Sequence, residues 1–182
     1  APLEMPITNG PAMGFAKKVC SRTAIAPFRD KAGRDIPVFV AGGVKNGADM
    51  ARYMKEGAAG AQFATRFIAT AECDASEGYK QRLLAAKADD ITLVKSPVGM
   101  PGRAIMNPFL KKMTAEGEKV TRCFRCLEHC DPANSPYCIT QALINAAQGD
   151  EDRALIFCGS NACRAEKIET VEEVMRDLCC GA

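Results

Sequence analysis

Two short apolar runs flank an amphipathic stretch in the first half of the chain and predict a strand, a helix and a second strand. Residues 36–40 are apolar and stop before Gly42 and Gly43, which is typical of a strand that is buried on both faces. Apolar residues recur with a helical period over residues 46–57, and a second strand is expected at 60–64. The connection of about 20 residues has the length that a parallel crossover needs, so the two strands should be neighbours.

The same alternation continues to the end of the chain. Capping-box spacing at Asp74 and Glu77 predicts a helix that ends near Lys87, and residues 91–94 form a strand-like run. Further along, the pattern predicts a helix from Pro136 to Gly149, a strand over 154–158 and, after a capping box at Thr170 and Glu173, a final helix. The polar stretch at residues 113–120 marks a boundary. The fold class is therefore α/β.

Length and composition limit what this chain does. With 182 residues and 47% hydrophobic content it can bury one core, but a complete (β/α)8 barrel needs about 250 residues. Interspersed acids and bases with a net charge of +2 offer no basic face for nucleic acid, and no apolar run reaches the roughly 18 residues of a membrane span. The ten cysteines, in a sequence of ordinary enzyme composition, are expected to be reduced thiols in a cytoplasmic protein.

The carboxyl ends of the first two strands are the candidate ligand site. Parallel strands present their carboxyl ends at one edge, and there the sequence places Gly42, Gly43, Ala64 and Thr65. Glycines let backbone N–H groups approach an anion closely, and a threonine hydroxyl donates one more hydrogen bond. From spacing alone, a phosphate cradle and an ordinary glycine turn fit equally well, because no Gly-x-Gly-x-x-Gly signature is present.

Several segments together resemble one enzyme family. They are Ile-Pro-Val-x-x-Ala-Gly-Gly-Val at residues 36–44, Gly-Ala-x-Gly-Ala-Gln-Phe-Ala-Thr-Arg-Phe at 57–67, Glu-Cys-Asp-Ala at 72–75, the Pro/Gly-rich run at 95–105, and Gly-Ser-Asn-Ala at 159–162. This pattern resembles the nitronate monooxygenase (2-nitropropane dioxygenase-like) family, which includes flavin-dependent enoyl-acyl carrier protein reductases and is built on a TIM barrel. The resemblance covers most of the chain.

The resemblance implies an FMN-dependent oxidoreductase that oxidises nitronates or reduces an enoyl-type substrate, with NAD(P)H as a possible donor. Residues 1–113 would supply the last β/α units of the barrel, and residues 114–182 would form a Cys-rich extension packed on it. The chain would then be the carboxyl-terminal portion of a longer protein and would be inactive without the preceding half of the barrel. Whether the protein forms a homodimer is left open. The expected FMN-binding residues are Gly42, Gly43, Gln62, Phe63, Ala64 and Thr65.

Two positions depart from the family pattern. Ala64 stands where relatives usually have glycine, which adds one methyl group near the phosphate. Matching Gly14 and Phe15 to the family loop places Ala12 at the position of the histidine base, and a methyl group cannot accept a proton. Nitronate oxidation by the usual route is therefore in doubt, unless this loop aligns differently. Arg103 is a candidate for binding a substrate anion, or else a structural ion-pair partner.

A second hypothesis rests on a cluster of cysteines in the second half of the chain. The Cys-x2-Cys-x3-Cys-x7-Cys spacing could bring thiols around an iron–sulfur cluster or a tetrahedral zinc ion, with His129 as a further possible ligand. This four-cysteine set is Cys123, Cys126, Cys130 and Cys138. The alternative is that the thiols are structural and pack a small extension. On the metal hypothesis the chain is an electron-transfer or structural module on a barrel remnant.

Overall fold

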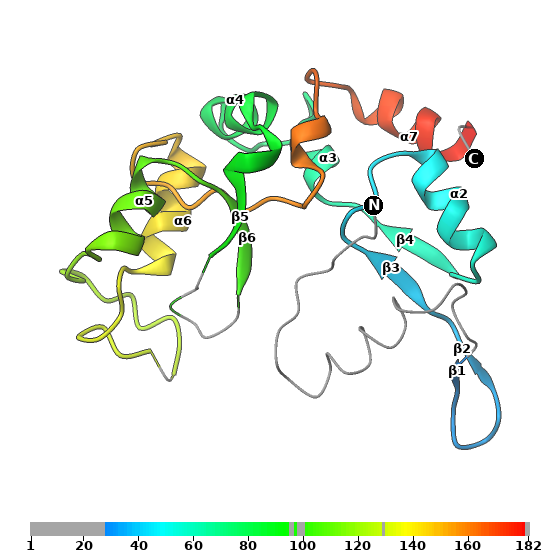
Figure 1. Ribbon diagram of the computed structural model, residues 1–182, viewed down its shortest axis with the longest axis horizontal. Helices are drawn as coiled ribbons and strands as arrows, with labels where there is room; N and C mark the ends of the chain where they lie inside the picture. The colour runs from blue at the N-terminus through cyan, green and yellow to red at the C-terminus, as the bar shows by residue number, and fades with distance from the viewer. Residues whose placement is uncertain (1–27, 95–96, 98–100, 129, 181–182) are drawn as a thin grey trace. The chain divides into compact units, whose positions relative to one another are not determined.

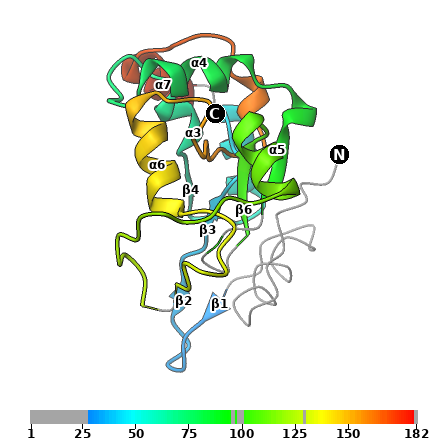
Figure 2. The same cartoon turned by 90° about the vertical axis from the view of Figure 1, so that its left-hand side faces the viewer.

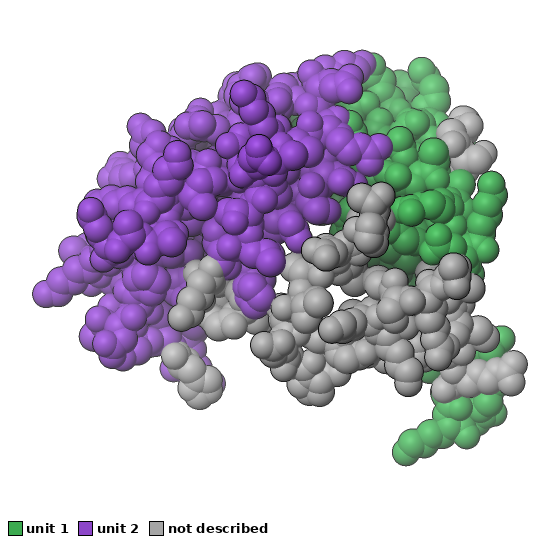
Figure 3. All heavy atoms as spheres, viewed as in Figure 1, with its two compact units in different colours: residues 1–72, 169–182 green, residues 73–168 purple. Residues whose placement is uncertain are grey.

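The computed structural model describes residues 28–94, 97, 101–128 and 130–180 (Figure 1). Within these ranges, no helix is both long and apolar enough to cross a membrane. The chain forms two compact units (Figure 3). Unit 1 holds the described residues up to 72 together with 169–180, and unit 2 holds those from 73 to 168. The boundary that the sequence predicts between residues 113 and 114 falls inside unit 2 and remains a prediction.

Unit 1 is built on a β-α-β element. Strands β3 and β4 pair in parallel, with Phe39 opposite Gly60 and Ala41 opposite Gln62, and helix α2 connects them. Helix α2 packs on β4 and against α7. The elements of this unit are β1 (Phe28–Arg29), β2 (Asp35–Ile36), β3 (Phe39–Ala41), α2 (Gly47–Lys55), β4 (Gly60–Gln62), α3 (Thr65–Ile68) and α7 (Val171–Cys180). The predicted parallel crossover is confirmed.

The strand expected at residues 36–40 is divided in two. Asp35 and Ile36 pair with β1 in an antiparallel ladder, and β3 starts only at Phe39. Pro37 lies between the two pieces and has no N–H to contribute to a ladder, which explains the break. The expectation of burial on both faces is also wrong here, because Phe39 is 65% exposed. Among the described residues, the sheet of β3 and β4 has two strands, and several of their residues are exposed.

Local sequence signals set the helix ends of unit 1. The side chain of Asn46 accepts a hydrogen bond from the Asp49 N–H at 2.9 Å and caps α2, and Gly57 follows the helix with a φ of 103°. The predicted capping box before α7 is confirmed: the Glu173 N–H donates to Thr170 Oγ1 at 3.1 Å, and the Thr170 N–H donates to the Glu173 carboxylate at 2.7 Å.

Unit 2 pairs its two strands antiparallel, with Ile91 opposite Ile105 and Val94 opposite Gly102. Phe157 adds a β-bridge to Ala104 from an otherwise irregular segment, where the sequence predicts a strand. The elements are α4 (Glu77–Ala85), η1 (Ala88–Asp90), β5 (Ile91–Val94), β6 (Gly102–Ile105), α5 (Pro108–Ala115), α6 (Ile139–Gln148) and η2 (Ala162–Arg164). Its core includes Val94, Ala104, Leu110, Met113, Tyr137, Ala142 and Leu155.

Two helix starts in unit 2 lie later than the sequence predicts. Ser76, not Asp74, caps α4, and its hydroxyl also donates to the Ala146 carbonyl at 2.8 Å. Helix α6 begins after Cys138, although Ser135 and Pro136 have the composition of a helix start. The Ser135 N–H and hydroxyl instead bond the Asp131 carbonyl, at 3.0 and 2.8 Å, within a local turn. Short-range turn bonding therefore outcompetes the helical signal here.

Candidate functional site

The ends of β3 and β4 bring the predicted ligand-binding residues to one edge of unit 1. Ala41 and Gln62 are the last paired residues of the two strands. Gly42 follows the first strand and Phe63 the second, so both connecting loops leave the sheet from adjacent positions (Figure 1). This adjacency is what a ligand site at the carboxyl ends of parallel strands requires.

Both glycines of the first loop have a left-handed backbone. The φ angles of Gly42 and Gly43 are 81° and 72°, values that L side chains rarely adopt. A Cβ atom built on Gly42 would meet no heavy atom within 4 Å. The glycine is therefore required by the backbone conformation and not by crowding, and the space on the side where a Cβ would lie is open. A bulky anion could approach the backbone at this point.

The second loop tolerates its alanine. Ala64 has φ −136° and ψ −65°, which does not demand glycine, and its side chain is exposed. Its carbonyl accepts the N–H groups of Phe67 and Ile68 at 2.9 and 3.1 Å and so starts α3. Gln62 is exposed, whereas Phe63 and Thr65 are half-buried. The added methyl group thus strains neither the loop nor the helix.

Arg66 ties the two loops together, a role that the sequence analysis did not identify. Its guanidinium binds both Glu169 carboxylate oxygens, at 2.9 and 2.8 Å, and donates to the Lys45 carbonyl at 3.0 Å and to Asp177. The hydrogen bond to Glu169 is the main cause that raises the pKa of Arg66. Because Arg66 follows β4 and Lys45 follows β3, one side chain links both candidate loops to α7. An arginine amid apolar residues at 57–67 was the available signal.

The loop amides are not all available to a ligand. The Lys45 N–H donates to the Asp49 carboxylate at 3.0 Å, inside the first turn of α2. The Arg66 guanidinium forms ion pairs with Glu169 and Asp177. Any anion at this edge would therefore be held by the backbone near Gly42 and by the residues around Thr65, and not by the Arg66 charge.

Arg103 lies in unit 2, on β6 opposite Leu93, and is half-buried. Its carbonyl accepts the Cys158 N–H at 2.9 Å. Burial raises the pKa of the Cys158 thiol to about 11, and the Arg103 charge partly opposes this rise. Arg103 therefore has a neighbour within its own unit, and its predicted contact with a substrate anion remains a prediction.

The four-cysteine set belongs to the segment that connects α5 to α6 in the same unit. Figure 2 shows the course of this segment. Cys123 and Cys126 are exposed, whereas Cys130 and Cys138 are half-buried, and all four are free thiols. In the part of the chain that the structure describes, no three His, Cys, Asp or Glu side chains form a ready metal-binding group. His129 and Ala12, both singled out by the sequence, lie outside the described residues.

Known proteins that are similar to this chain support the resemblance seen in the sequence. The profile of the nitronate monooxygenase family matches residues 10–181. A probable nitronate monooxygenase of Staphylococcus saprophyticus is 34% identical over 86 residues, which cover 47% of this chain and 24% of that protein. A Mycobacterium tuberculosis protein is named (3aS,4S,5R,7aS)-5-hydroxy-7a-methyl-1-oxo-octahydro-1H-indene-4-carboxyl-CoA dehydrogenase. It is 34% identical over 110 residues, which cover 60% of this chain and 31% of that protein.

Among solved structures, FabK from Thermotoga maritima superposes with a TM-score of 0.65 at 27% sequence identity. The match covers 81% of this chain and 44% of the FabK chain. The matches therefore span about a quarter to a third of the two curated relatives and less than half of the solved structure. Because the family profile matches almost the whole sequence, this chain belongs to the nitronate monooxygenase family.

Proposed function

We propose that this chain supplies the phosphate-binding edge of an FMN-dependent oxidoreductase, as the carboxyl-terminal part of a TIM barrel. The family contains oxidoreductases, and the relatives named above are a probable nitronate monooxygenase and an indene-4-carboxyl-CoA dehydrogenase. The complete enzyme would oxidise a nitronate or reduce an enoyl-type substrate with NAD(P)H as donor. With Ala12 aligned to the position of the family's histidine base, no proton acceptor is in view there, and we weigh the reductive and the oxidative chemistry equally.

One observation carries this proposal: the paired ends of β3 and β4 are followed by two left-handed glycines on one side and by Ala64 and Thr65 on the other. The open space at Gly42 suits a tetrahedral anion that hydrogen-bonds to backbone N–H groups. The family assignment makes the FMN phosphate the natural anion.

Each residue then has a simple task. Gly42 is exposed and would let the phosphate approach the peptide groups of the first loop, behind which Gly43 is buried, and the Thr65 hydroxyl would donate a hydrogen bond. The exposed side chain of Gln62 lies at the end of β4, where it could bond the polar edge of the flavin ring. Bound flavin supplies the electron and hydride transfer, while the protein positions it and excludes competing reactions.

Introducing a negative charge at Gly42 tests the phosphate assignment. Asn and Asp both tolerate a left-handed backbone and have the same shape, so Gly42→Asn and Gly42→Asp differ essentially in one negative charge. A carboxylate about 6 Å from a phosphate, at an effective dielectric constant of about 40, repels it by about 1.4 kcal/mol per charge pair. We expect Gly42→Asp to bind FMN at least about tenfold more weakly than Gly42→Asn does, measured by flavin fluorescence.

Two comparisons make this test specific. Riboflavin lacks the phosphate, so its affinity should be nearly equal in the two variants. Gly33 provides the matched control, because its φ is 79° and a Cβ there would also meet no heavy atom within 4 Å. Gly33→Asp lies in the β1–β2 turn and should leave FMN binding unchanged. Equal FMN affinities of Gly42→Asp and Gly42→Asn would exclude the phosphate from this edge.

A further inference from the structure

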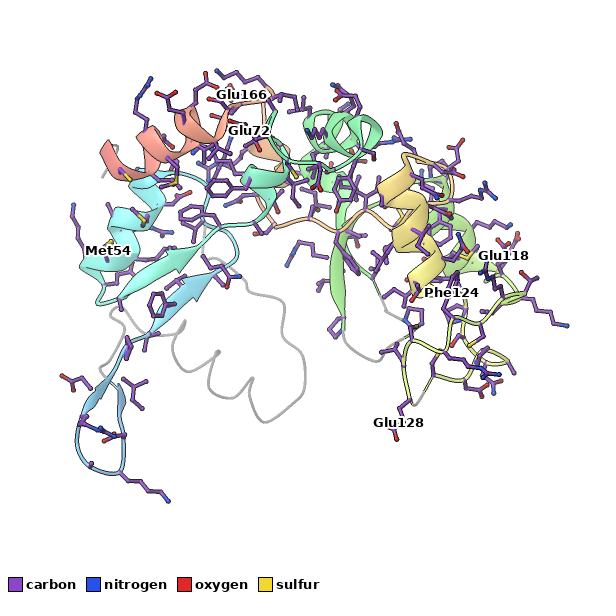
Figure 4. All side chains as sticks on the ribbon, turned by 180° about the vertical axis from the view of Figure 1, so that it is seen from behind. Met54, Glu72, Glu118, Phe124, Glu128 and Glu166 are labelled. Carbon is purple, nitrogen blue, oxygen red and sulfur yellow. The ribbon has the colours of Figure 1, made fainter. Side chains whose placement is uncertain are left out.

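The long segment between α5 and α6 lacks regular structure. Its described residues, from 117 to 138 without 129, form neither helix nor strand. Structureless loops of more than about 15 residues are uncommon in compact domains unless they have a function or are disordered. In Figure 4, Glu128 projects from the outer tip of this segment, away from α6. Something other than a hydrogen-bonded ladder must therefore hold the segment in a defined shape.

The four-cysteine set lines a single small cavity within this segment. All four residues border a space of about 20 Å³. The rest of its wall is mainly apolar and includes Val120, Phe124, Leu127, Pro132 and Ile139. A space of this size admits one water-sized particle, whereas a cluster of several irons and sulfides needs far more room. All four cysteines thus border room for one atom, with Cys130 and Cys138 half-buried and Cys123 and Cys126 exposed on the solvent side.

Two of the sulfurs already accept hydrogen bonds from the protein. The Arg125 N–H points to Cys123 Sγ at 3.4 Å, and the Thr140 hydroxyl donates to Cys126 Sγ at 2.9 Å. Arg125 has a φ of 51°, the only positive φ among the described non-glycine residues. This left-handed turn in Cys-x-x-Cys directs a backbone N–H to the first sulfur. Donors of this kind stabilise thiolate ligands and orient them around a metal.

A buried phenol borders the same cavity. Tyr137 is 6% exposed, and its hydroxyl has no hydrogen-bond partner among the described residues. A buried hydroxyl without a partner costs roughly as much as a lost hydrogen bond. Its neighbour Cys138 is the residue before α6, and its side chain makes no capping hydrogen bond to that helix. A sulfur bound to a metal ion in this cavity would offer the Tyr137 hydroxyl an acceptor.

We propose that Cys123, Cys126, Cys130 and Cys138 bind one tetrahedral metal ion, Zn²⁺ or Fe²⁺, which fixes the segment between α5 and α6. The sulfurs are not yet in ligand positions, so binding draws them inward onto the ion. Each thiol loses its proton as its sulfur binds, and the protons pass to solvent. No electron transfer is involved in this step. All four cysteines belong to unit 2, so this proposal does not rest on the proposed flavin site in unit 1.

Metal content and Co²⁺ substitution test this site. Protein purified without chelator should contain about one zinc or iron per chain, with no acid-labile sulfide. Co²⁺ added to the metal-free protein should give the visible bands of a tetrahedral thiolate complex with a stoichiometry of one. Elemental analysis and the visible colour of an oxidised iron–thiolate centre distinguish the two metals. Limited trypsin digestion should cut after Lys119, Arg122 or Arg125 only in metal-free protein.

Single substitutions assign the ligands. Cys126→Ser should abolish the cobalt spectrum, while Cys163→Ser, a half-buried thiol outside the set, should leave it intact. Thr140→Val removes the hydroxyl bonded to Cys126 and should weaken Co²⁺ binding about tenfold or more. If Cys126→Ser fails to fold, Cys130→His provides a second variant, since it should keep one cobalt per chain with weaker sulfur-to-cobalt absorption.

Three results would overturn the proposal. One is a metal content no higher in the wild-type protein than in Cys126→Ser. The second is a disulfide within the four-cysteine set in protein prepared without oxidant. The third is labile sulfide with more than one iron per chain, which would replace the single ion with a cluster.

Discussion

Replacing Arg66 with methionine should destabilise unit 1 more than any exposed charge deletion. Methionine keeps much of the side-chain length but removes the guanidinium. The side chains of Arg66 and Glu169 are only 11% and 19% exposed, so their bidentate pair is partly desolvated. The change also removes the bond to the Lys45 carbonyl and the contact with Asp177.

The magnitude follows from this partial burial. Deleting one member of a fully buried ion pair costs about 3–5 kcal/mol, whereas exposed pairs contribute about 0–1 kcal/mol. Because Asp177 is 38% exposed, we expect a loss near the lower end of the buried range, about 3 kcal/mol. In a chain of this size that corresponds to a fall in Tm of about 6–12 °C.

Urea unfolding monitored by circular dichroism measures this loss, and Arg176→Met is the matched control. Arg176 pairs with Glu172 one turn away on α7, with exposures of 67% and 79%, so its removal should cost less than about 0.5 kcal/mol. A double-mutant cycle of Arg66→Met with Glu169→Gln should give a coupling energy of at least about 1 kcal/mol. The Arg66 variant should also bind FMN more weakly, since both loops lose their shared anchor.

Equal unfolding midpoints for Arg66→Met and Arg176→Met would refute this reasoning. So would a coupling energy near zero, because the bidentate pair would then contribute nothing in solution. Normal stability with weakened FMN binding would show instead that Arg66 acts on the ligand directly.

Two further predictions concern unit 2. Asn107 is 1% exposed, and its side chain accepts a hydrogen bond from the Leu110 N–H at 2.9 Å and donates one to the Ala154 carbonyl at 2.8 Å. Asn107→Ala should therefore lower the free energy of unfolding, measured by urea titration, by about 2–3 kcal/mol. A loss below about 0.5 kcal/mol would contradict this prediction. Burial raises the pKa of Tyr79 from about 10 to about 12, and its hydroxyl donates to the Phe157 carbonyl at 2.6 Å. The raised pKa means that this stabilisation is complete below about pH 10 and is lost as the pH rises towards 12. The free energy of unfolding of Tyr79→Phe should therefore depend less on pH in that range than that of the wild-type protein. An identical pH dependence of the two proteins would count against this prediction.

Local signals in the sequence were sufficient for much of the secondary structure. Asn46, Gly57 and the Thr170–Glu173 capping box set the ends of α2 and α7, because these effects act within one helical turn. The length of the connection predicted the parallel pairing of β3 and β4, since a crossover of that size leaves few other arrangements.

Non-local effects were not readable in this way. Residues 35–36 pair with β1 and residues 39–41 pair with β4, so partners elsewhere in the chain divide a run that periodicity treats as one strand. The antiparallel pairing of β5 with β6 was likewise not predicted. Neighbouring elements compete for the same backbone groups, and the outcome depends on partners far along the chain. The helix start at Pro136 failed for a local reason instead, because the turn at Asp131 bonds Ser135 first.

For the candidate site, the sequence by itself determined which residues follow the two strands and which cysteines share a short segment. Only the tertiary structure decided that Gly42 needs glycine for its φ angle and not for space, and that Ala64 does not. The link from Arg66 to Glu169 likewise spans 103 positions, a separation at which no periodicity or spacing rule operates. Local patterns fix chemistry and order, whereas contacts between distant residues arise only when the chain has folded.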